Sequence, residues 1–511
     1  MEWIGLLPIF LPLLAAPILT RARRARSTFI LAFFVLQIGA IFLPRAFDAP
    51  RLVLADWQAA SFTLAFRADG IAIALWLALL IPFCAIGLAA PRAPFDFSAL
   101  GIFSGAMLLI AADGAPAILF AWILLDLAIF ARRLANEIEI ASAARGLSVG
   151  IFAALIFFAG LMLNNATLVA LALWARLALF PFHPGLPTRG ADNSDLWIAR
   201  AAPMLTGAAV WMRVGPPDAW IVWLAGATFI IALIWIWREE EPARAVTISA
   251  MHALALIPLA RAFGGNAGAA FALWLAIGAA FAFGFFELAL RWRADNRNRY
   301  PRLLWFAGVI ALASAPLTPG LFGRAGTYIA LWASGQWLAL LLAGTATTGL
   351  HAPLWNFAFA ISGAETRDPR RGEYAGLAIL LCAFAVFTFA GVPFAQAFDA
   401  PLREAADAAM ARVIWTDDAL GVLIGFLFLL APIIASYLLR GIARAIRPRP
   451  SSFATRVARW LDLVWLERAL TRIGNRIGLS ARNISGIAEE NPTLWLLLVG
   501  LWVAILILAA R

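Results

Sequence analysis

Long runs of apolar residues, separated by short polar or arginine-rich stretches, recur along the 511-residue chain. A helix needs roughly 20 apolar residues to cross the hydrocarbon core of a bilayer, and a helix satisfies its own backbone hydrogen bonds there. The pattern therefore predicts an all-α polytopic membrane protein with about 14–16 transmembrane helices. The candidate spans begin near Trp3, Thr28, Gly70, Phe97, Ala115, Ser148, Thr167, Ile198, Ala219, Ala245, Gly268, Leu303, Ala325, Tyr374, Ala419 and Thr493.

Two segments near the ends of the chain need a separate interpretation. The first run, from Trp3 to Leu19, is followed by arginines and further spans rather than by a small-residue cleavage site. We therefore expect a retained helix and not a signal peptide. From Phe453 to Ile487, apolar residues recur at helical spacing between arginines, which predicts an amphipathic lateral helix before the last span. This helix could anchor to lipid headgroups, brace the neighbouring spans or dock a partner.

Composition and charge fit this class of protein. Hydrophobic residues make up 63% of the chain and charged residues 14%, which excludes a soluble globular domain. The net charge of +11 comes from arginine, since the chain contains no lysine, and in a helical bundle such charge indicates topology rather than nucleic-acid binding. Every arginine cluster follows an odd-numbered span: 21–26, 132–145, 291–302, 367–371 and 440–449. The positive-inside rule then predicts a multi-pass protein of the inner (cytoplasmic) membrane with both termini on the outer side.

Ionisable residues inside the predicted spans are the first candidates for function, because an unpaired charge in hydrocarbon costs several kcal/mol. These residues are Asp126, Arg176, Glu287 and Arg324. Both arginines adjoin stretches rich in Pro and Gly, which predict two broken helices at membrane depth. His183 lies in the stretch after Arg176, and His252 is a polar insertion in its span. A buried His with satisfied hydrogen bonds is the favoured interpretation of His252, ahead of a relay role.

No motif in the sequence indicates a cofactor or a metal site. Cys84 and Cys382 lie far apart in apolar runs, and the chain contains only three His. These numbers indicate neither a metal nor a haem site. No nucleotide, flavin or iron–sulfur motif is present either, so we expect no cofactor, and any redox chemistry would belong to partner subunits. Whether the chain takes part in an enzymatic reaction is left open, but no catalytic residue of its own is expected.

Four stretches together resemble a known family. The run from Arg176 to Pro187, Arg-Leu-Ala-Leu-Phe-Pro-Phe-His-Pro-Gly-Leu-Pro, is similar to the motif Lys-Ser-Ala-Gln-Phe-Pro-Leu-His-x-Trp-Leu-Pro of the antiporter-like membrane subunits of respiratory complex I and of the Mrp sodium/proton antiporters. Further stretches agree with that family in order and spacing: Leu205 to Arg213, Thr247 to Ser249 with Ala269 to Phe271, and Pro319 to Arg324. The resemblance covers roughly residues 69 to 336.

The resemblance implies a proton path and a division of the chain. In this family a Glu on the fifth helix pairs with the Lys of the first broken helix, and further Lys or His residues lead to the second break. The resemblance therefore implies four regions: N-terminal transmembrane helices (1–95), an antiporter-like core with the broken helices (96–350), C-terminal transmembrane helices (351–450), and the amphipathic helix with the last span (451–511). The implied partners are other membrane subunits of a larger complex, the lipid bilayer, and protons or sodium.

Position by position, this chain departs from the family pattern. Ile123 stands at the position of the paired Glu, and Asp126, about one turn on, is the nearest substitute. Arg176 and Arg324 replace the lysines of the two breaks, and an arginine in a protein does not give up its proton. Apolar residues occupy four further polar positions of the family, with Glu287 as a nearby charge: Leu205, Leu273, Ile277 and Phe281. The resemblance thus implies a degenerate member with a weakened central proton path.

Three functions remain open at this stage. The first is a proton- or cation-translocating subunit of an assembly of the complex I, Mrp or hydrogenase type. The second is a non-conducting structural or partner subunit of the same family, for example in an inorganic-carbon uptake complex. The third is a polytopic membrane transferase with Asp48, Asp56 or His183 as catalytic groups. The third accounts less well for the two breaks beside buried arginines.

Overall fold

The computed structural model describes residues 6–21, 26–47, 51–57, 62–89, 97–135, 140–182, 200–215, 220–237, 239–294, 300–360, 371–389, 407, 411 and 419–445. The chain divides into one unit of Met1–Val53 and Ala65–Pro448 and a second of Leu54–Leu64 and Arg449–Arg511. The predicted amphipathic helix and the last span, from Thr493, lie outside the described residues, as does His183.

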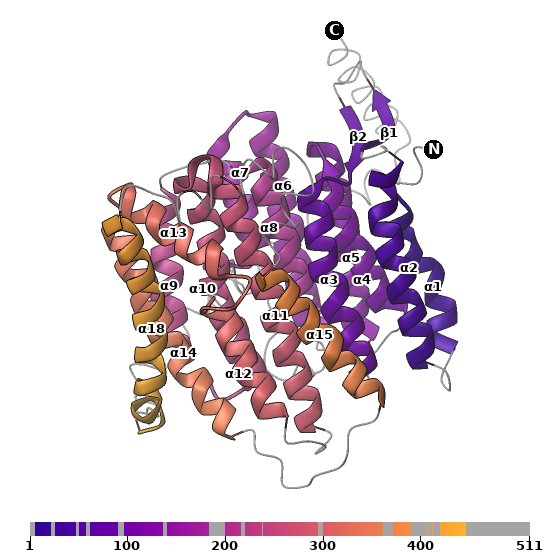
Figure 1. Ribbon diagram of the computed structural model, residues 1–511. Coiled ribbons are helices and arrows are strands. Elements are labelled where there is room, and N and C mark those ends of the chain that lie inside the picture. The colour runs from indigo at the N-terminus through magenta and orange to yellow at the C-terminus, as the bar shows by residue number, and fades with distance from the viewer. Residues whose placement is uncertain are drawn as a thin grey trace. The chain divides into compact units, whose positions relative to one another are not determined.

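Helices make up nearly all of the first unit, as the apolar pattern predicts (Figure 1). The helices before the middle of the chain are α1 (Leu7–Arg21), α2 (Arg26–Ala46), α3 (Gly70–Ala89), α4 (Phe97–Ala111), α5 (Ala115–Ala135), α6 (Ile140–Met162), α7 (Ala166–Arg176) and α8 (Ala202–Val214). Those after it are α9 (Ile221–Ile236), α10 (Pro242–Phe263), α11 (Gly268–Ala294), α12 (Pro301–Leu312), α13 (Leu321–Ala333), α14 (Trp337–Ala360), α15 (Arg371–Phe389) and α18 (Ala419–Ala445).

Length and composition make this a multi-pass membrane protein. Within the described residues, 7 helices are long and apolar enough to cross a membrane. Helices α3 and α11 are central, with 94% of the spanning window buried in each, whereas only 22% is buried in α15 and in α18. The outward residues of α18, such as Leu423, Leu427 and Leu438, are apolar and exposed. An apolar exposed face of this kind suits contact with lipid tails.

Two features differ from the sequence prediction. The span predicted from Ala325 is in fact two helices, because α13 ends at Ala333 and Gly335 turns the chain with φ +72° before α14 begins. An apolar pattern cannot show such a turn when both helices are apolar. Short strands were also not predicted: β1 (Arg51–Trp57), β2 (Phe62–Arg67) and β3 (Ala112–Asp113). Ala65 of β2 lies opposite Asp113 of β3 in an antiparallel pair.

The two predicted helix breaks are present, and the helices that precede them, α7 and α12, end with the same backbone geometry. After α7, the amide of Ala178 donates to Ala175 O (2.9 Å) and that of Leu179 to Trp174 O (3.5 Å). After α12, Ser314 and Ala315 make the equivalent bonds. Ala178 (φ +53°) and Ser314 (φ +52°) both adopt the left-handed conformation. This is the Schellman motif at a helix C-terminus. For non-glycine residues the left-handed backbone costs roughly 1–2 kcal/mol.

Helix α13 lies close against α11 because glycines replace side chains at the contact. A Cβ added at Gly326 would overlap the ring of Phe271, a fully buried residue of α11. By contrast, a Cβ added at Gly101 of α4 would meet nothing within 4 Å. The second break is therefore held by close helix packing.

Gly326→Ala should lower the free energy of unfolding by about 1–3 kcal/mol, because the buried Phe271 ring has to shift to admit a methyl group. The matched change Gly101→Ala should leave it unchanged or raise it by up to about 1 kcal/mol, since Ala is the better helix former. Unfolding of the detergent-solubilised protein, followed by circular dichroism, measures both. Equal effects of the two changes would contradict the close approach of α13 to α11.

Candidate functional site

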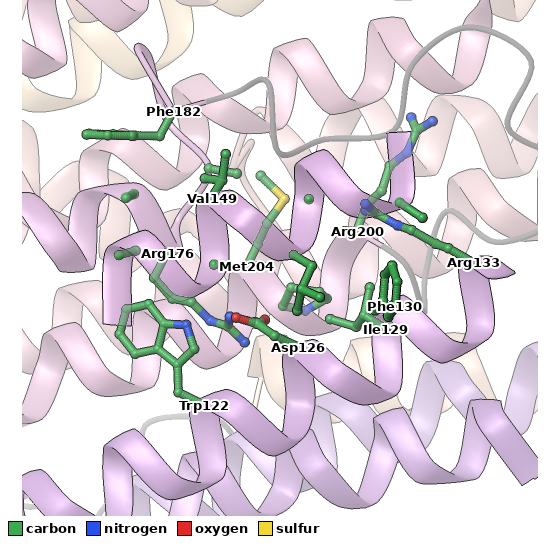
Figure 2. Close-up of a pocket in the computed structure, with 18 residues that line it drawn as sticks. Trp122, Asp126, Ile129, Phe130, Arg133, Val149, Arg176, Phe182, Arg200 and Met204 are labelled. Atoms are coloured by element: carbon green, nitrogen blue, oxygen red, sulfur yellow. The ribbon is translucent and has the colours of Figure 1, made fainter. Parts of the chain in front are cut away.

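A buried ion pair joins α5 to the end of α7. Nη1 of Arg176 donates to Oδ1 of Asp126, and the two side chains are only 4% and 10% exposed. The guanidinium group also lies over the ring of Trp122, 4.9 Å from its centroid. Trp122 and Asp126 are four residues apart on α5 and so share a face of that helix. Figure 2 shows Arg176 between these two side chains.

Glycines on two neighbouring helices leave room for the pair. A Cβ added at Gly150 of α6 would overlap the carboxylate of Asp126. A Cβ added at Gly207 of α8 would come within 3.1 Å of Cγ of Arg176. A larger residue at Gly150 would have to displace the carboxylate, and one at Gly207 would press on the Arg176 side chain and its backbone. Four helices, α5, α6, α7 and α8, thus position the ion pair together.

A cavity of about 70 Å³ lies beside the pair, bounded by residues of these helices (Figure 2). A volume of this size has room for several water molecules. Its charged lining residues, among those that the structure describes, are Asp126, Arg133, Arg176 and Arg200. All four residues are buried, with 5–8% exposure. The site is therefore a partly open space of water size, lined among the described residues by one carboxylate and three guanidinium groups.

The position of Arg133 and Arg200 at this cavity was not predicted from the sequence. Arg133 was assigned to a cytoplasmic loop cluster, but it belongs to α5, two turns beyond Asp126 on the same face. Arg200 lies just before α8, and its Nη1 donates to Ala243 O (3.0 Å) and Thr247 Oγ1 (2.5 Å) at the start of α10. The sequence offered one indication of this position: Arg200 stands directly before a short helix that follows a break.

A second cluster of buried polar residues lies around Arg324 of α13. Its Nη2 donates to Leu312 O at the end of α12 (3.1 Å), and its Nη1 lies 3.4 Å from Thr347 Oγ1 on α14. The hydroxyl of Tyr328 is also 3.4 Å from Thr347 Oγ1. Within the described part of the chain, no carboxylate forms an ion pair with Arg324. The second break thus holds a buried guanidinium group among neutral partners.

Two histidines lie beside this group, and only one of them was predicted. Nε2 of His252 is 3.1 Å from Ala343 O, and Nδ1 of His351 is 2.7 Å from Thr347 O. A carbonyl oxygen only accepts hydrogen bonds, which assigns the N–H to these two nitrogens. The other ring nitrogens, Nδ1 of His252 and Nε2 of His351, have no partner among the described residues. The ring centroids are 6.5 Å apart. His351 lies in α14, an apolar helix that the sequence pattern did not separate from α13.

Helix α11 carries the other positions that the sequence singled out: one carboxylate, Glu287, and three apolar residues. Glu287 forms an ion pair with Arg291 on its own helix, α11, with Nε and Oε1 2.5 Å apart. On the same helix, Leu273, Ile277 and Phe281 are fully buried. At these positions the interior of α11 is therefore apolar, as the sequence indicates.

Removing one partner of the Asp126–Arg176 pair should destabilise the fold strongly. Asp126→Leu or Arg176→Met leaves a buried charge without its partner, and we expect each to lower the free energy of unfolding by about 3–5 kcal/mol. The double variant should recover much of that loss, because no charge is then left alone. A double-mutant cycle of denaturant unfolding in detergent measures the coupling. Simple addition of the two losses would contradict the ion pair.

Comparisons with known proteins agree on the fold. No protein-family profile and no curated protein sequence matches the chain. One solved structure similar to it is a chain of respiratory complex I from Thermus thermophilus with bound NADH (17% identity, 80% of this chain and 99% of that one, TM-score 0.67). A second is a chain of the Mrp complex from Dietzia sp. DQ12-45-1b (14% identity, 93% and 60%, TM-score 0.68). A third is a chain of the membrane-bound sulfane sulfur reductase, an archaeal respiratory membrane complex (14% identity, 100% of both chains, TM-score 0.65). The chain therefore has the fold of membrane chains from these assemblies.

Proposed function

We propose that this chain is an antiporter-like membrane subunit of a complex I- or Mrp-like assembly, where it takes part in proton or cation translocation coupled to partner subunits. The observation that carries the proposal is the ion pair between Asp126 of α5 and Arg176 at the end of the broken helix α7. This is the pairing of helices that the resemblance implies, made by different residues. The fold shared with chains of respiratory and Mrp complexes supports the same function and suggests other membrane subunits as partners.

The central path in this proposal is weakened. A relay needs groups that accept and release protons, and the guanidinium groups of Arg176 and Arg324 stay charged. The α11 positions Leu273, Ile277 and Phe281 offer no polar atom in their side chains. Asp126 and Arg176 then act mainly through their charge: the carboxylate offsets the guanidinium group and lowers the electrostatic barrier to a cation in the neighbouring cavity.

A non-conducting subunit of the same kind is the second candidate. The apolar interior of α11 favours it, because a continuous proton path would have to go around that helix or through ordered water. Under both functions we propose that the protein lies in the inner membrane with its termini on the outer side; the three arginine clusters that precede the second break support this orientation.

The experiment that separates the two functions measures proton and sodium flux in proteoliposomes containing the assembly. If the subunit translocates, Asp126→Ala should reduce flux to the level of empty vesicles, because Arg176 then presents an uncompensated positive charge. Arg176→Lys should increase flux, since a buried lysine can release its proton. Glu240→Ala, at an exposed carboxylate before α10, is the control and should leave flux unchanged. Wild-type flux that is unchanged by both Asp126→Ala and Arg176→Lys would exclude translocation through this site, and absence of wild-type flux would favour the non-conducting subunit.

A further inference from the structure

Two arginines from different helices lie over one aromatic ring at an edge of the bundle. Cζ of Arg302, in the first turn of α12, is 4.4 Å from the ring centroid of Phe359, near the end of α14. Cζ of Arg440, near the end of α18, is 5.1 Å from the same centroid and 3.6 Å from that of Tyr437. The start of α12 and the ends of α14 and α18 lie at the bottom of the view in Figure 1. The three helix ends thus bring two guanidinium groups together in one small patch.

The positive charge of this patch is not neutralised within the part of the chain that the structure describes. No carboxylate there forms an ion pair with Arg302 or Arg440. Nη1 of Arg440 donates to the carbonyl of Tyr437 (3.1 Å), which is a neutral partner. The ring faces attract the two cations without cancelling their charge. Arg302 is exposed and Arg440 is partly exposed, so an anion from outside the protein can reach both.

Exposed apolar surface continues from the patch along the outer face of the bundle. Ile434 and Leu438 are exposed one turn apart on α18, and Leu303 is exposed directly after Arg302 on α12. In a multi-pass membrane protein such surface suits contact with lipid tails. Tyr437, which is also exposed, is a residue type enriched at the level of the headgroups. The arginines therefore lie where a lipid would place its headgroup if its tails covered this apolar face.

The patch is held in place by contacts between α14 and α18. Nε1 of Trp355 on α14 donates to Oγ of Ser436 on α18 (2.9 Å). The Trp355 ring also meets the ring of Tyr437 edge-on, with the centroids 5.7 Å apart. A site whose side chains are already positioned loses less entropy when a ligand binds. The geometry thus favours a defined binding position over diffuse attraction to charged lipid.

We propose that Arg302 and Arg440 together bind the phosphate group of an anionic lipid, such as phosphatidylglycerol, whose acyl chains lie along the exposed face of α18. Guanidinium groups match phosphate oxygens in geometry, and basic sites between membrane helices bind anionic headgroups. The apolar surface beside the arginines favours a lipid over a free phosphate. The proposal does not depend on translocation, since a conducting and a non-conducting subunit could both carry such a lipid.

Native mass spectrometry of the detergent-solubilised full chain, titrated with lipid, tests the headgroup preference. We expect phosphatidylglycerol to bind about tenfold or more tightly than phosphatidylcholine with the same acyl chains, because the choline cation offsets the phosphate charge. Glycerol phosphate, which has no acyl chains, should not compete at equal concentration. Equal affinity for the two lipids would overturn the proposal. Competition by glycerol phosphate as strong as that by phosphatidylglycerol would show a site for a free anion and would also overturn it.

Substitutions then locate the bound lipid. Arg302→Gln and Arg440→Gln should each weaken phosphatidylglycerol binding by about fivefold, and the double variant by about tenfold or more, with phosphatidylcholine binding unchanged. Arg67→Gln, at an exposed arginine of β2, is the matched control and should leave both affinities unchanged. Should the double variant fail to fold, Arg302→Gln alone carries the test, because its side chain is exposed. Unchanged phosphatidylglycerol affinity in Arg302→Gln would contradict the proposed site and would leave the arginines to an acidic segment of a partner subunit.

Discussion

A guanidinium group buried in a membrane protein cannot lose its charge, and the structure around the first helix break is built on that constraint. Arg176 stands at the end of α7, where the chain leaves helical geometry, and Asp126 of α5 offsets its charge. Trp122 covers the guanidinium group, while Gly150 and Gly207 keep α6 and α8 from displacing the charged groups. The break, the two glycines and the carboxylate are parts of one arrangement.

The second break has the same backbone geometry but, among the described residues, no carboxylate beside its arginine. Arg324 donates to Leu312 O and lies near the hydroxyl of Thr347, which also contacts His252. Together the two breaks give the interior fixed positive charge where the resembled family carries lysines. Fixed charge suits electrostatic coupling better than a relay that must load and unload protons.

Much of this arrangement follows from the sequence, and the remainder has a physical reason for being hidden. Apolar runs predicted the helices, and the Pro and Gly stretches predicted both breaks. Asp126 was identified as the partner of Arg176 through the resemblance, since separation along the chain does not reveal contacts across 50 residues. The turn at Gly335 was missed because both flanking helices are apolar. Arg133 was read as topological charge and Arg200 was given no role, and only the packing of α5 and α8 places them at a cavity.

We propose that Asp126 and Arg176 form a fixed pair of charges rather than a group that exchanges protons. Infrared difference spectra of the membrane-embedded protein between about pH 5 and pH 9 test it directly, because a protonated carboxyl group absorbs apart from a carboxylate. We expect no protonated-carboxyl signal in this range that is lost on Asp126→Asn substitution. A signal that appears in the native protein and vanishes in that variant would show that Asp126 takes up a proton, which a fixed pair of charges does not do.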